Sequence, residues 1–450
     1  SGEGTAAWLN HYPEIEAVDL LITDTCGVFR GKRIPGDGLA KALEDGIRLP
    51  ASIFALDING ENVSGTGLVW RSGDADFAVR PVDGRIIPVP WARRPMAQLL
   101  MTMIDDDGAP YFADPRQVLA RVVKRFAELG LTPVVAIELE FYLLDRARDA
   151  QGRPQAPIAP ASGRRDSSTQ VYGLTSLDDF GKVLSDIQDA CAAQDIPADA
   201  AVSEYAPGQF EINLQHVADP MLAADHAMLF KRTVKSVASA NGLDASFMAK
   251  PFPELAGNGF HIHLSLVDDK QCNVFDGGEA VVSDTMRHAI GGLMNSMSEA
   301  MAVFAPTANS YRRFKAGAYA PMTPSWGINN RTVAIRVPGG SGSSRRLEHR
   351  VAGADANVYL TLAALLAGAH WGIVNKIDPG PPLAGNAYDK LHAALPRRWS
   401  EALDVMEKGK VLPGYFGERY VPLFIANRRG ELAKFESHVS DLEYAWYLPL

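Results

Sequence analysis

From residue 346 to residue 351, three charged side chains alternate with leucine, histidine and valine, which is the pattern of a β-strand with two different faces. Successive side chains of a strand point to opposite faces, so Arg346, Glu348 and Arg350 share one face while Leu347 packs behind it. A carboxylate between two guanidinium groups is poor core material, and arginine binds carboxylate and phosphate oxygens with two hydrogen bonds at once. The strand therefore predicts a site for an anionic, metal-bound ligand.

The chain has 450 residues, which exceeds the usual size of one domain, so at least two domains are expected. Hydrophobic residues make up 47% and charged residues 22%, as in ordinary folded proteins rather than disordered ones. The net charge of −9 argues against a nucleic-acid-binding surface. The three cysteines are widely spaced and form no Cys-x-x-Cys pair, which favours a reducing compartment, so the protein is expected to be cytoplasmic.

The longest apolar run, residues 356–374, approaches the length of about 20 residues that a membrane span needs. It contains Asn357, His370 and several glycines, and it follows the charged strand directly. A buried core helix is therefore expected here, and no contact with a membrane.

The pattern along the chain predicts an α+β fold with a domain boundary near residue 110. Residues 1–110 form a small strand-rich domain, and residues 111–450 a larger domain in which strands and helices alternate. Asp114 and Pro115 are an N-cap and a first helical residue, and they predict a helix over residues 116–129. The further strands are expected at 18–29, 133–144, 210–215, 259–267, 332–337 and 345–351, with two short strands within 74–89 around a turn at 83–84. The further helices are expected at 39–46, 177–194, 219–241, 285–304 and from 356.

Two acidic pairs and a histidine pair stand at strand spacing. Glu138 and Glu140 lie two apart and share one face, where their charges repel unless a cation lies between them. Glu204 and Glu211 flank a Pro-Gly turn that can bring both acids together. A solvated strand face is the alternative for an isolated pair of this kind. Oxygen ligands favour Mg²⁺ or Mn²⁺.

The glycine-rich segment 257–265 places His261, His263 and Ser265 on one strand face. Two such histidines suit metal binding or phosphate contact, although a hydrogen-bonded core histidine is the alternative for each alone. Arg331 and Arg336 are five residues apart, so they need a turn or bulge to serve one site. Neither a Walker-type phosphate loop nor a Rossmann fingerprint occurs, so any ATP site must be of another kind.

The order of these motifs is distinctive: Glu-x-Glu-Phe, Glu…Gly-Gln-x-Glu, Gly-x-Gly-x-His-x-His-x-Ser, Asn-Arg-x-x-x-Ile-Arg and Arg-x-Glu-x-Arg. The chain resembles the glutamine synthetase superfamily, type I branch, over essentially its whole length. The resemblance implies an N-terminal β-grasp-like domain and a catalytic glutamine-synthetase/guanido-kinase-like domain with a curved antiparallel sheet flanked by helices. It also implies two stacked hexameric rings with active sites between neighbouring subunits.

The resemblance further implies the roles of individual residues, with two or three Mg²⁺ or Mn²⁺ ions per site and ATP as co-substrate. One ion would be held by Glu140, Glu204 and Glu211, and another by Glu138, His261 and Glu348. The ATP contacts would be Arg331, Arg336, Arg346, Ser265 and His263. The contacts to L-glutamate would be Arg313, Arg350 and Gly257.

The implied reaction joins the γ-carboxylate of glutamate to an amine through a γ-glutamyl phosphate. In glutamine synthetases an aspartate loop and a flap glutamate bind ammonium and take its proton. Here Asp57 keeps the acid of that loop, but Tyr319 replaces the flap glutamate. A tyrosine removes one charge and adds an aromatic face, which suits an alkylammonium better than ammonium. Asp57, Arg331 and Tyr319 are therefore the expected catalytic residues, and ammonia is expected to be a poor substrate.

We therefore expect an amine ligase that uses putrescine, spermidine or another polyamine, or a monoamine. Glu61 could pair with a distal ammonium, or could belong to a solvated loop. An ordinary glutamine synthetase with another base and an inactive structural relative are the alternatives. An inactive relative predicts missing metal or arginine positions, and all of them are present.

Overall fold

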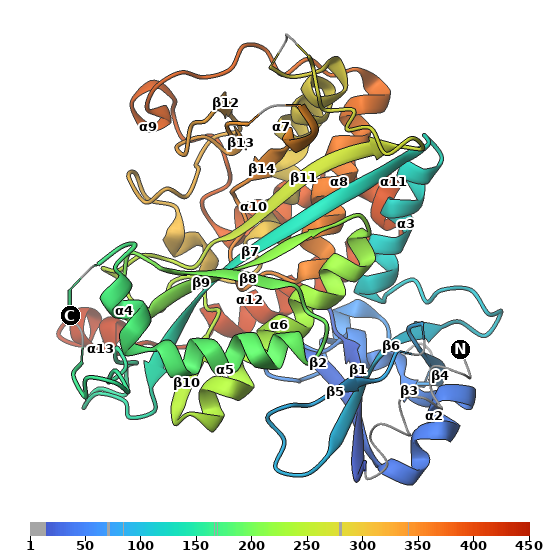
Figure 1. Cartoon of the computed structure of the whole chain (residues 1–450), viewed down its shortest axis with the longest axis vertical. Helices are drawn as coiled ribbons and strands as arrows, with labels where there is room; N and C mark the ends of the chain where they lie inside the picture. Colours follow the sequence, from blue (N-terminus) through green and yellow to red (C-terminus); the bar gives the residue numbers. More distant parts are fainter. Residues whose placement is uncertain are drawn as a thin grey trace.

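The computed structural model describes residues 15–450 except 70–72, 84, 166, 169, 279–280 and 341. It contains two sheets, a six-stranded one near the N-terminus and an eight-stranded one formed by later residues (Figure 1). The smaller sheet has the order β2-β1-β6-β4-β3, with β5 beside β6. Its strands are β1 (Ala17–Thr23), β2 (Phe29–Pro35), β3 (Ile47–Pro50), β4 (Asp76–Pro81), β5 (Ile87–Pro88) and β6 (Met96–Ile104).

The strand expected over residues 18–29 is two strands joined by a tight turn. The carboxylate of Asp24 accepts a hydrogen bond from the Val28 backbone at 2.8 Å, and its carbonyl accepts one from Gly27 at 3.0 Å. Gly27 has φ of +78°, which favours glycine. The turn folds β2 back antiparallel to β1, while β6 pairs with β1 in parallel. The short helix α2 (Leu39–Asp45) agrees with the prediction.

The larger sheet has the order β12-β13-β14-β11-β7-β9-β8, with β10 beside β7. Its pairs are antiparallel except β12 with β13, so the expected antiparallel sheet is confirmed apart from this edge. Its strands are β7 (Leu131–Asp145), β8 (Ala198–Ser203), β9 (Gln209–Val217), β10 (Leu243–Ser246), β11 (Phe260–Asp268), β12 (Trp326–Ile328), β13 (Ile335–Val337) and β14 (Leu347–His349).

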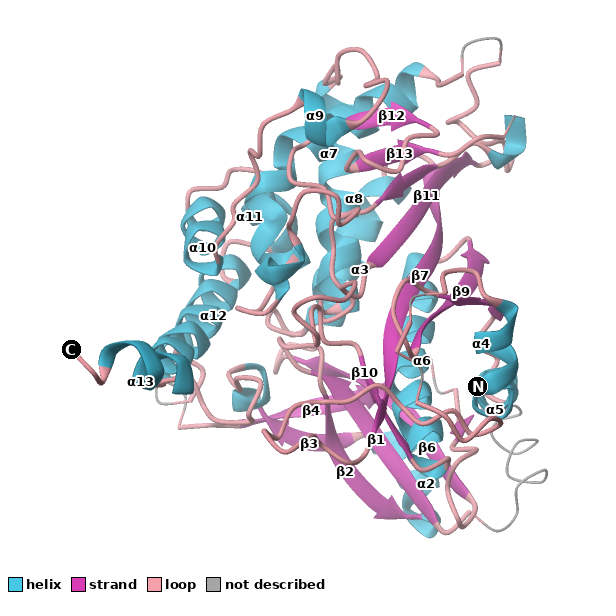
Figure 2. Cartoon of the chain, turned by 90° about the vertical axis from the view of Figure 1, so that its left-hand side faces the viewer, coloured by secondary structure: helices cyan, strands magenta, loops and turns pink. Residues whose placement is uncertain are grey.

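Helices pack around this sheet, with α7, α8, α10 and α11 gathered on one side of β7 and β11 (Figure 2). The main helices are α3 (Pro115–Ala127), α4 (Leu174–Asp179), α5 (Gly181–Ala192), α6 (Pro220–Ala240), α7 (Asp284–Phe304), α8 (Val358–Asn375), α9 (Ala387–Lys390), α10 (Trp399–Glu407), α11 (Leu412–Phe416), α12 (Tyr420–Glu436) and α13 (Asp441–Tyr447). As predicted, Asp114 caps α3 by accepting from the Arg116 backbone, and Pro115 is its first residue. The helix expected over 177–194 is instead divided at Phe180 into α4 and α5.

Helix α8 is long and apolar enough to cross a membrane, with a mean hydropathy of 1.4 over its 18 residues. However, 78% of it is buried inside the protein, which confirms the expected core helix. It packs closely on α7, because a side chain on Gly292 would lie 2.1 Å from the carbonyl oxygen of Gly368.

The predicted domain boundary near residue 110 falls between the end of β6 at Ile104 and the start of α3 at Pro115. Two large apolar clusters form on either side of this segment, one around the six-stranded sheet and one around the eight-stranded sheet. Leu423 of α12 joins the first cluster, so α12 contacts the N-terminal domain. The boundary itself remains a prediction.

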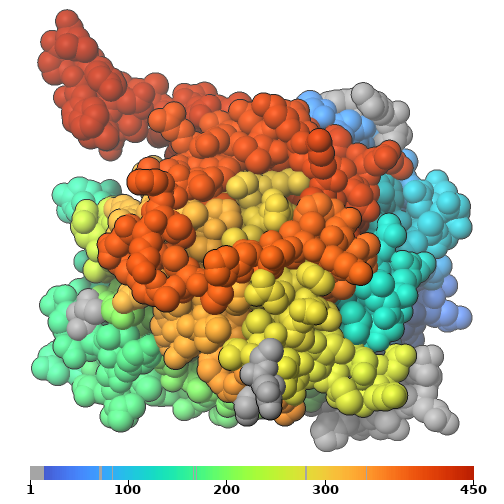
Figure 3. Space-filling view, turned by 90° about the horizontal axis from the view of Figure 1, so that it is seen from above, coloured from blue at the N-terminus to red at the C-terminus, as the bar shows by residue number. Residues whose placement is uncertain are grey.

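The chain ends in an exposed arm formed by α13 and the residues around it. Figure 3 shows this arm projecting from the body of the molecule. No residue of α13 is buried, and Leu442, Tyr444 and Trp446 expose 54%, 54% and 62% of their surface. A capping box formed by Ser440 and Glu443 begins the helix. Local hydrogen bonds therefore stabilise α13, although none of its residues is buried against the body of the protein.

Candidate active site

A cavity of about 350 Å³ opens beside the eight-stranded sheet and contains most of the predicted site residues. Strand β7 supplies Glu138 and Glu140 to it, and the alternate residues Ile137, Leu139 and Phe141 are buried on the other face. The expected strand alternation is therefore present. The lining includes Glu138, Glu140, Glu204, Glu211, Gly257, His261, Arg313, Tyr319, Arg331, Arg336, Glu348 and Arg350.

Glu140, Glu204 and Glu211 form one acidic group, whose oxygens lie within 4.8 Å of one another. Glu140 and Glu211 are direct partners across β7 and β9. Glu204 comes from the end of β8, where its N–H donates to the carbonyl of Gln209 at 2.9 Å and closes the turn between β8 and β9. The predicted convergence of the two acids around this turn is thus present in the structure.

The electrostatics of this group favour a bound cation. Burial, followed by the charges of Glu140 and Glu138, raises the pKa of Glu204 to about 8. Burial and the charges of Glu138 and Glu140 raise the pKa of Glu211 to about 10. Both acids would hold protons at neutral pH without a compensating charge. A divalent cation among the three carboxylates supplies that charge.

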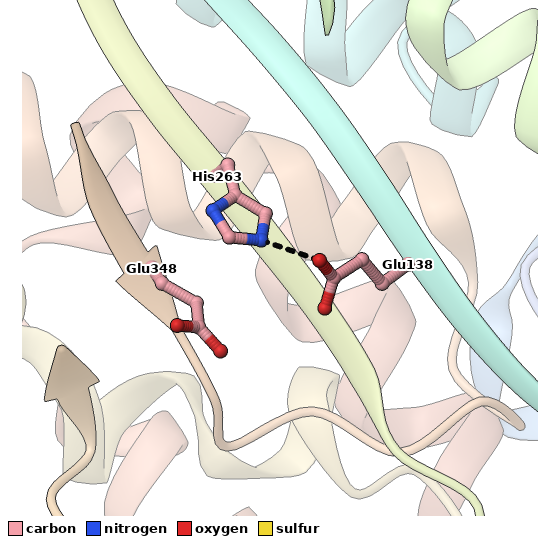
Figure 4. Close-up of side chains that lie close together, drawn as sticks. All are labelled: Glu138, His263 and Glu348. Atoms are coloured by element: carbon pink, nitrogen blue, oxygen red, sulfur yellow. Dashed lines mark hydrogen bonds and ion pairs between the residues drawn. The ribbon is translucent and has the colours of Figure 1, made fainter. Parts of the chain in front are cut away.

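A second group surrounds Glu138. His261 Nδ1 lies 3.3 Å from Oε2 of Glu138 and 3.9 Å from Oε1 of Glu348, so the three residues expected at a second ion are together. His263 Nε2 lies 2.8 Å from the other oxygen of Glu138. Figure 4 shows Glu138, His263 and Glu348 as a further cluster of ligand atoms. His263, which was expected on the ATP side alone, is therefore also close to this acidic group.

These donors fit a hard divalent cation. Every group consists of carboxylates with at most one imidazole, and none contains a cysteine. Oxygen-rich sets of this kind suit Mg²⁺ or Mn²⁺ rather than structural zinc. Gly259 makes room for them, because its N–H donates to Oε2 of Glu140 at 2.7 Å and a side chain there would meet His261 at 3.1 Å.

Arginines flank the acids on the other wall of the cavity. Glu348 accepts hydrogen bonds from Arg336, at 2.8 Å, and from Arg350. Burial acts to raise the pKa of Glu348, but the charges of Arg350 and the nearby histidines outweigh it and lower the pKa to about 2. Glu348 is therefore ionised and fixes both guanidinium groups in place.

Arg331 and Arg336 both line the cavity in spite of their odd spacing. The turn that the sequence required is present, because Asn329 has φ of +46° and the Asn330 side chain accepts from the backbone of Thr332. Arg331 thus lies just before β13, and Arg336 within it.

Arg313 and Gly257 share one corner of the cavity. Arg313 exposes only 5% of its surface and donates to the carbonyl of Val351 at 3.2 Å. A side chain on Gly257 would come within 2.7 Å of the Arg313 side chain, so the glycine leaves space for it.

The other residues expected on the ATP side line a second cavity of about 560 Å³. Ser265, His263 and Arg346 lie there, and Arg346 Nε donates to His263 Nδ1 at 3.1 Å. Glu138 lines both cavities. The two cavities therefore meet at the metal-ligand groups.

The structure does not bring Asp57 to this cavity. Asp57 is fully buried in the N-terminal domain, where one oxygen accepts from the backbone of Asn59 and Glu61 and the other lies 2.5 Å from Lys434 Nζ. Lys434 also pairs with Glu61 at 2.6 Å. Within its own chain, Asp57 thus anchors a loop to α12 and is not among the residues that line the first cavity.

Sequence reasoning missed Tyr172 and Tyr205 in the lining of the first cavity, and Lys434 beside Asp57. Tyr205 directly follows Glu204, so its position next to a candidate ligand was a usable signal. Lys434 is 377 residues from Asp57 in sequence, and no local pattern could have paired them.

Comparisons with known proteins agree with this geometry. The family described as "Glutamine synthetase, catalytic domain" matches residues 112–447. Gamma-glutamylputrescine synthetase PuuA of Escherichia coli (strain K12) is 44% identical over 98% of this chain and 93% of its own length. Glutamate–isopropylamine ligase of Pseudomonas sp is 32% identical over 97% of this chain and 95% of its own.

The solved structure of a GmaS/ADP complex superposes with a TM-score of 0.85 at 30% sequence identity, and covers 99% of both chains. The family resemblance predicted from the order of motifs is therefore confirmed. The chain belongs to the glutamine synthetase family.

Proposed function

We propose that this chain is an ATP-dependent ligase that joins the γ-carboxylate of L-glutamate to a primary alkyl amine. The observation that carries the proposal is the composition of the first cavity, in which carboxylate and imidazole groups face a set of arginines while Tyr319 forms part of the wall. Two similar enzymes are named for ligating glutamate to putrescine and to isopropylamine, which supports an amine rather than ammonia.

The first step transfers a phosphoryl group. The γ-carboxylate of glutamate attacks the γ-phosphorus of ATP, the bond to the bridging oxygen breaks, and ADP leaves with that electron pair. Arg313 and Arg350 would hold the carboxylates of glutamate, and Arg331 and Arg336 the transferred phosphoryl oxygens. Bidentate guanidinium contacts neutralise the charge that gathers on these oxygens.

Divalent ions would be held by Glu140, Glu204 and Glu211 and by Glu138, His261 and Glu348, and would neutralise phosphate charge. ATP would extend into the second cavity, towards Ser265, His263 and Arg346. Because Glu138 lines both cavities, phosphates that pass from one to the other would pass beside it.

The second step forms the amide. The alkylammonium first gives up a proton to solvent, and the lone pair of the resulting amine attacks the carbonyl carbon of γ-glutamyl phosphate. The bond from that carbon to the phosphate oxygen breaks, and inorganic phosphate departs with that electron pair and takes the second proton from the nitrogen. Tyr319, which exposes 47% of its surface, would contact the alkylammonium through its ring.

We also propose that the enzyme is a cytoplasmic homo-oligomer, with two stacked hexameric rings as the form expected for the family. The exposed apolar arm of residues 437–450 supports association with another subunit. Asp57 could serve only a neighbouring subunit's site, and only after Lys434 withdraws from it, because Asp57 is buried and fully paired within its own chain.

The test is ADP release by the purified protein with glutamate, Mg²⁺ and a panel of putrescine, spermidine, isopropylamine, ethanolamine and ammonia. We expect an amine to exceed ammonia by at least tenfold in kcat/KM. Clear preference for ammonia would identify an ordinary glutamine synthetase. Absence of ADP release with every amine would identify an inactive relative.

A further inference from the structure

Tyr205 and Tyr319 form a pair of stacked rings on the wall of the first cavity. Their ring centroids lie 6.2 Å apart, and the ring planes differ by 29°. Tyr205 exposes 43% of its surface and Tyr319 47%, although both line the cavity. Two large rings left open at a catalytic cavity add little to the core, so their exposed faces are available to a ligand.

The two rings come from segments far apart in sequence, and each is fixed by a different part of the site. Tyr205 lies in the turn between β8 and β9, directly after Glu204, and that turn is closed by the hydrogen bond between Glu204 and Gln209. Tyr319 lies in a loop in which the N–H of Ala318 donates to the carbonyl of Lys315 at 3.2 Å. The metal-ligand turn therefore determines where the Tyr205 ring stands.

The backbone at Tyr319 is in an unfavourable conformation. Its φ of +53° lies in the left-handed region, which a bulky residue rarely adopts. Such outliers gather at ligand-binding sites, where the surrounding structure maintains them. After the exposure of the ring at the cavity, the left-handed backbone of Tyr319 is a second indication that this ring contacts a ligand.

The chemistry of the pair suits an organic cation with a hydrocarbon chain. A neutral phenol ring offers an apolar surface to methylene groups and a negative face to an ammonium group. Ammonium itself has no chain to pack against such a surface.

We propose that Tyr205 is a specificity residue of the amine site, and that with Tyr319 it forms a wall against which the methylene chain of a linear primary amine packs. This inference rests on the proposed ligase function and narrows it to amines with several carbons. Each packed methylene group should raise kcat/KM about three- to fourfold, as expected for removing one methylene from water.

The test is a series of methylamine, ethylamine, propylamine and butylamine, assayed with the wild type, Y205A, Y205F and Y319A. Each rate is divided by the rate of hydroxamate formation by the same variant with hydroxylamine, a nucleophile without carbon. For the wild type we expect butylamine to exceed methylamine about 30- to 60-fold in kcat/KM, from three added methylenes. For Y205A the two amines should have nearly equal kcat/KM, with butylamine and methylamine differing by no more than about threefold.

Y205F keeps the ring and loses the hydroxyl. The logarithm of its butylamine-to-methylamine ratio in kcat/KM should be at least half of the wild-type value. Such a result would show that the ring packs against the amine, and that a hydrogen bond from the hydroxyl is not the cause of the preference. Thermal unfolding of each variant checks that it is folded. A Y205A variant with the wild-type ratio would overturn the inference while leaving the ligase proposal intact. A wild type that releases ADP neither with these four amines nor with the amines of the first panel would instead overturn the ligase proposal itself.

Discussion

The carboxylate of Glu138 lies between two imidazoles, and its contact with His263 is the shorter of the two, at 2.8 Å between Oε1 and Nε2. Burial acts to raise the pKa of Glu138, but its hydrogen bonds to His261 and His263 prevail and lower the pKa. This carboxylate is therefore ionised over the whole physiological range, and it lines both cavities. Replacing Glu138 with a neutral residue should therefore harm metal binding more than the same replacement at any other ligand.

We expect E138Q to lower kcat for ADP release by at least 100-fold, because the substitution keeps the shape and removes the charge. It should also reduce the increase in Tm on adding Mg²⁺, because one of the two proposed ion sites loses a ligand. E128Q is the matched control, since Glu128 has a side chain that is 55% exposed and makes only a 3.9 Å contact with Arg125. A metal-dependent Tm shift as large in E138Q as in the wild type would contradict the assignment of Glu138 as a ligand.

The raised pKa values of Glu204 and Glu211, about 8 and about 10, make metal binding depend on pH. Without metal, the folded state binds more protons than the unfolded state from about pH 4.5 up to these values. The free energy of unfolding should therefore fall as pH rises through this window.

Mg²⁺ needs both carboxylates ionised, so its binding should release protons and its apparent affinity should rise with pH. Tm shifts on adding Mg²⁺ at pH 6 and pH 8, together with calorimetry in buffers of different ionisation enthalpy, measure both effects. A larger shift at pH 6 than at pH 8 would contradict this prediction.

Lys434 fastens the Asp57 loop to α12 through two carboxylates, and the other contacts come from the same helix. Asn427 donates to the carbonyl of Leu56 at 2.9 Å, and Glu431 accepts from the Ile58 backbone at 3.1 Å. We expect K434M to speed hydrogen exchange of the amides in residues 57–61 about fivefold, while the free energy of unfolding falls only slightly because Lys434 is partly exposed.

K408M, at the exposed C-cap of α10, is the control for removing a lysine charge without removing an ion pair to Asp57. Equal exchange rates in K434M and the wild type would mean that Asn427 and Glu431 hold the loop without the ion pair.

Gly292 lies where α7 crosses α8, and an added side chain would meet the carbonyl of Gly368 at 2.1 Å. We expect G292A to destabilise the protein by about 1–3 kcal/mol, because neither helix backbone can move without disturbing the core. G414A in α11 is a matched control, since nothing lies within 4 Å of its added side chain. Chemical denaturation of the two variants measures the difference, and equal midpoints would show that the helices can separate at little cost.

Removal of residues 438–450 deletes the exposed apolar surface of α13. If the arm joins subunits, light scattering after size-exclusion chromatography should give a lower molar mass for the shortened chain than for the full chain. Thermal unfolding at low protein concentration should change little, because the arm covers none of the cores. An unchanged molar mass would assign the arm another role.

The sequence allowed the parts of the site that obey strand periodicity to be predicted. Glu138 and Glu140 share a face because side chains of a strand alternate, and the Asp114–Pro115 start of α3 depends on neighbouring residues alone. Pairings that only tertiary folding creates were not predictable, such as Lys434 with Asp57 or the stacking of Tyr205 on Tyr319. The break at Phe180 was missed because the apolar spacing continues through it.

Strand β7 runs for 15 residues through the middle of the larger sheet, with Glu138 opposite His261 and Ile137 opposite Ile262. A slip of one residue against β11 would exchange its two faces, turning both glutamates into the apolar interior and presenting isoleucine and leucine to the metal ions. Such a misregistered chain would lose its hydrophobic contacts and its chemistry at the same moment. Every molecule in which this region is stably folded should therefore be catalytically active, and no stably folded but inactive population should exist.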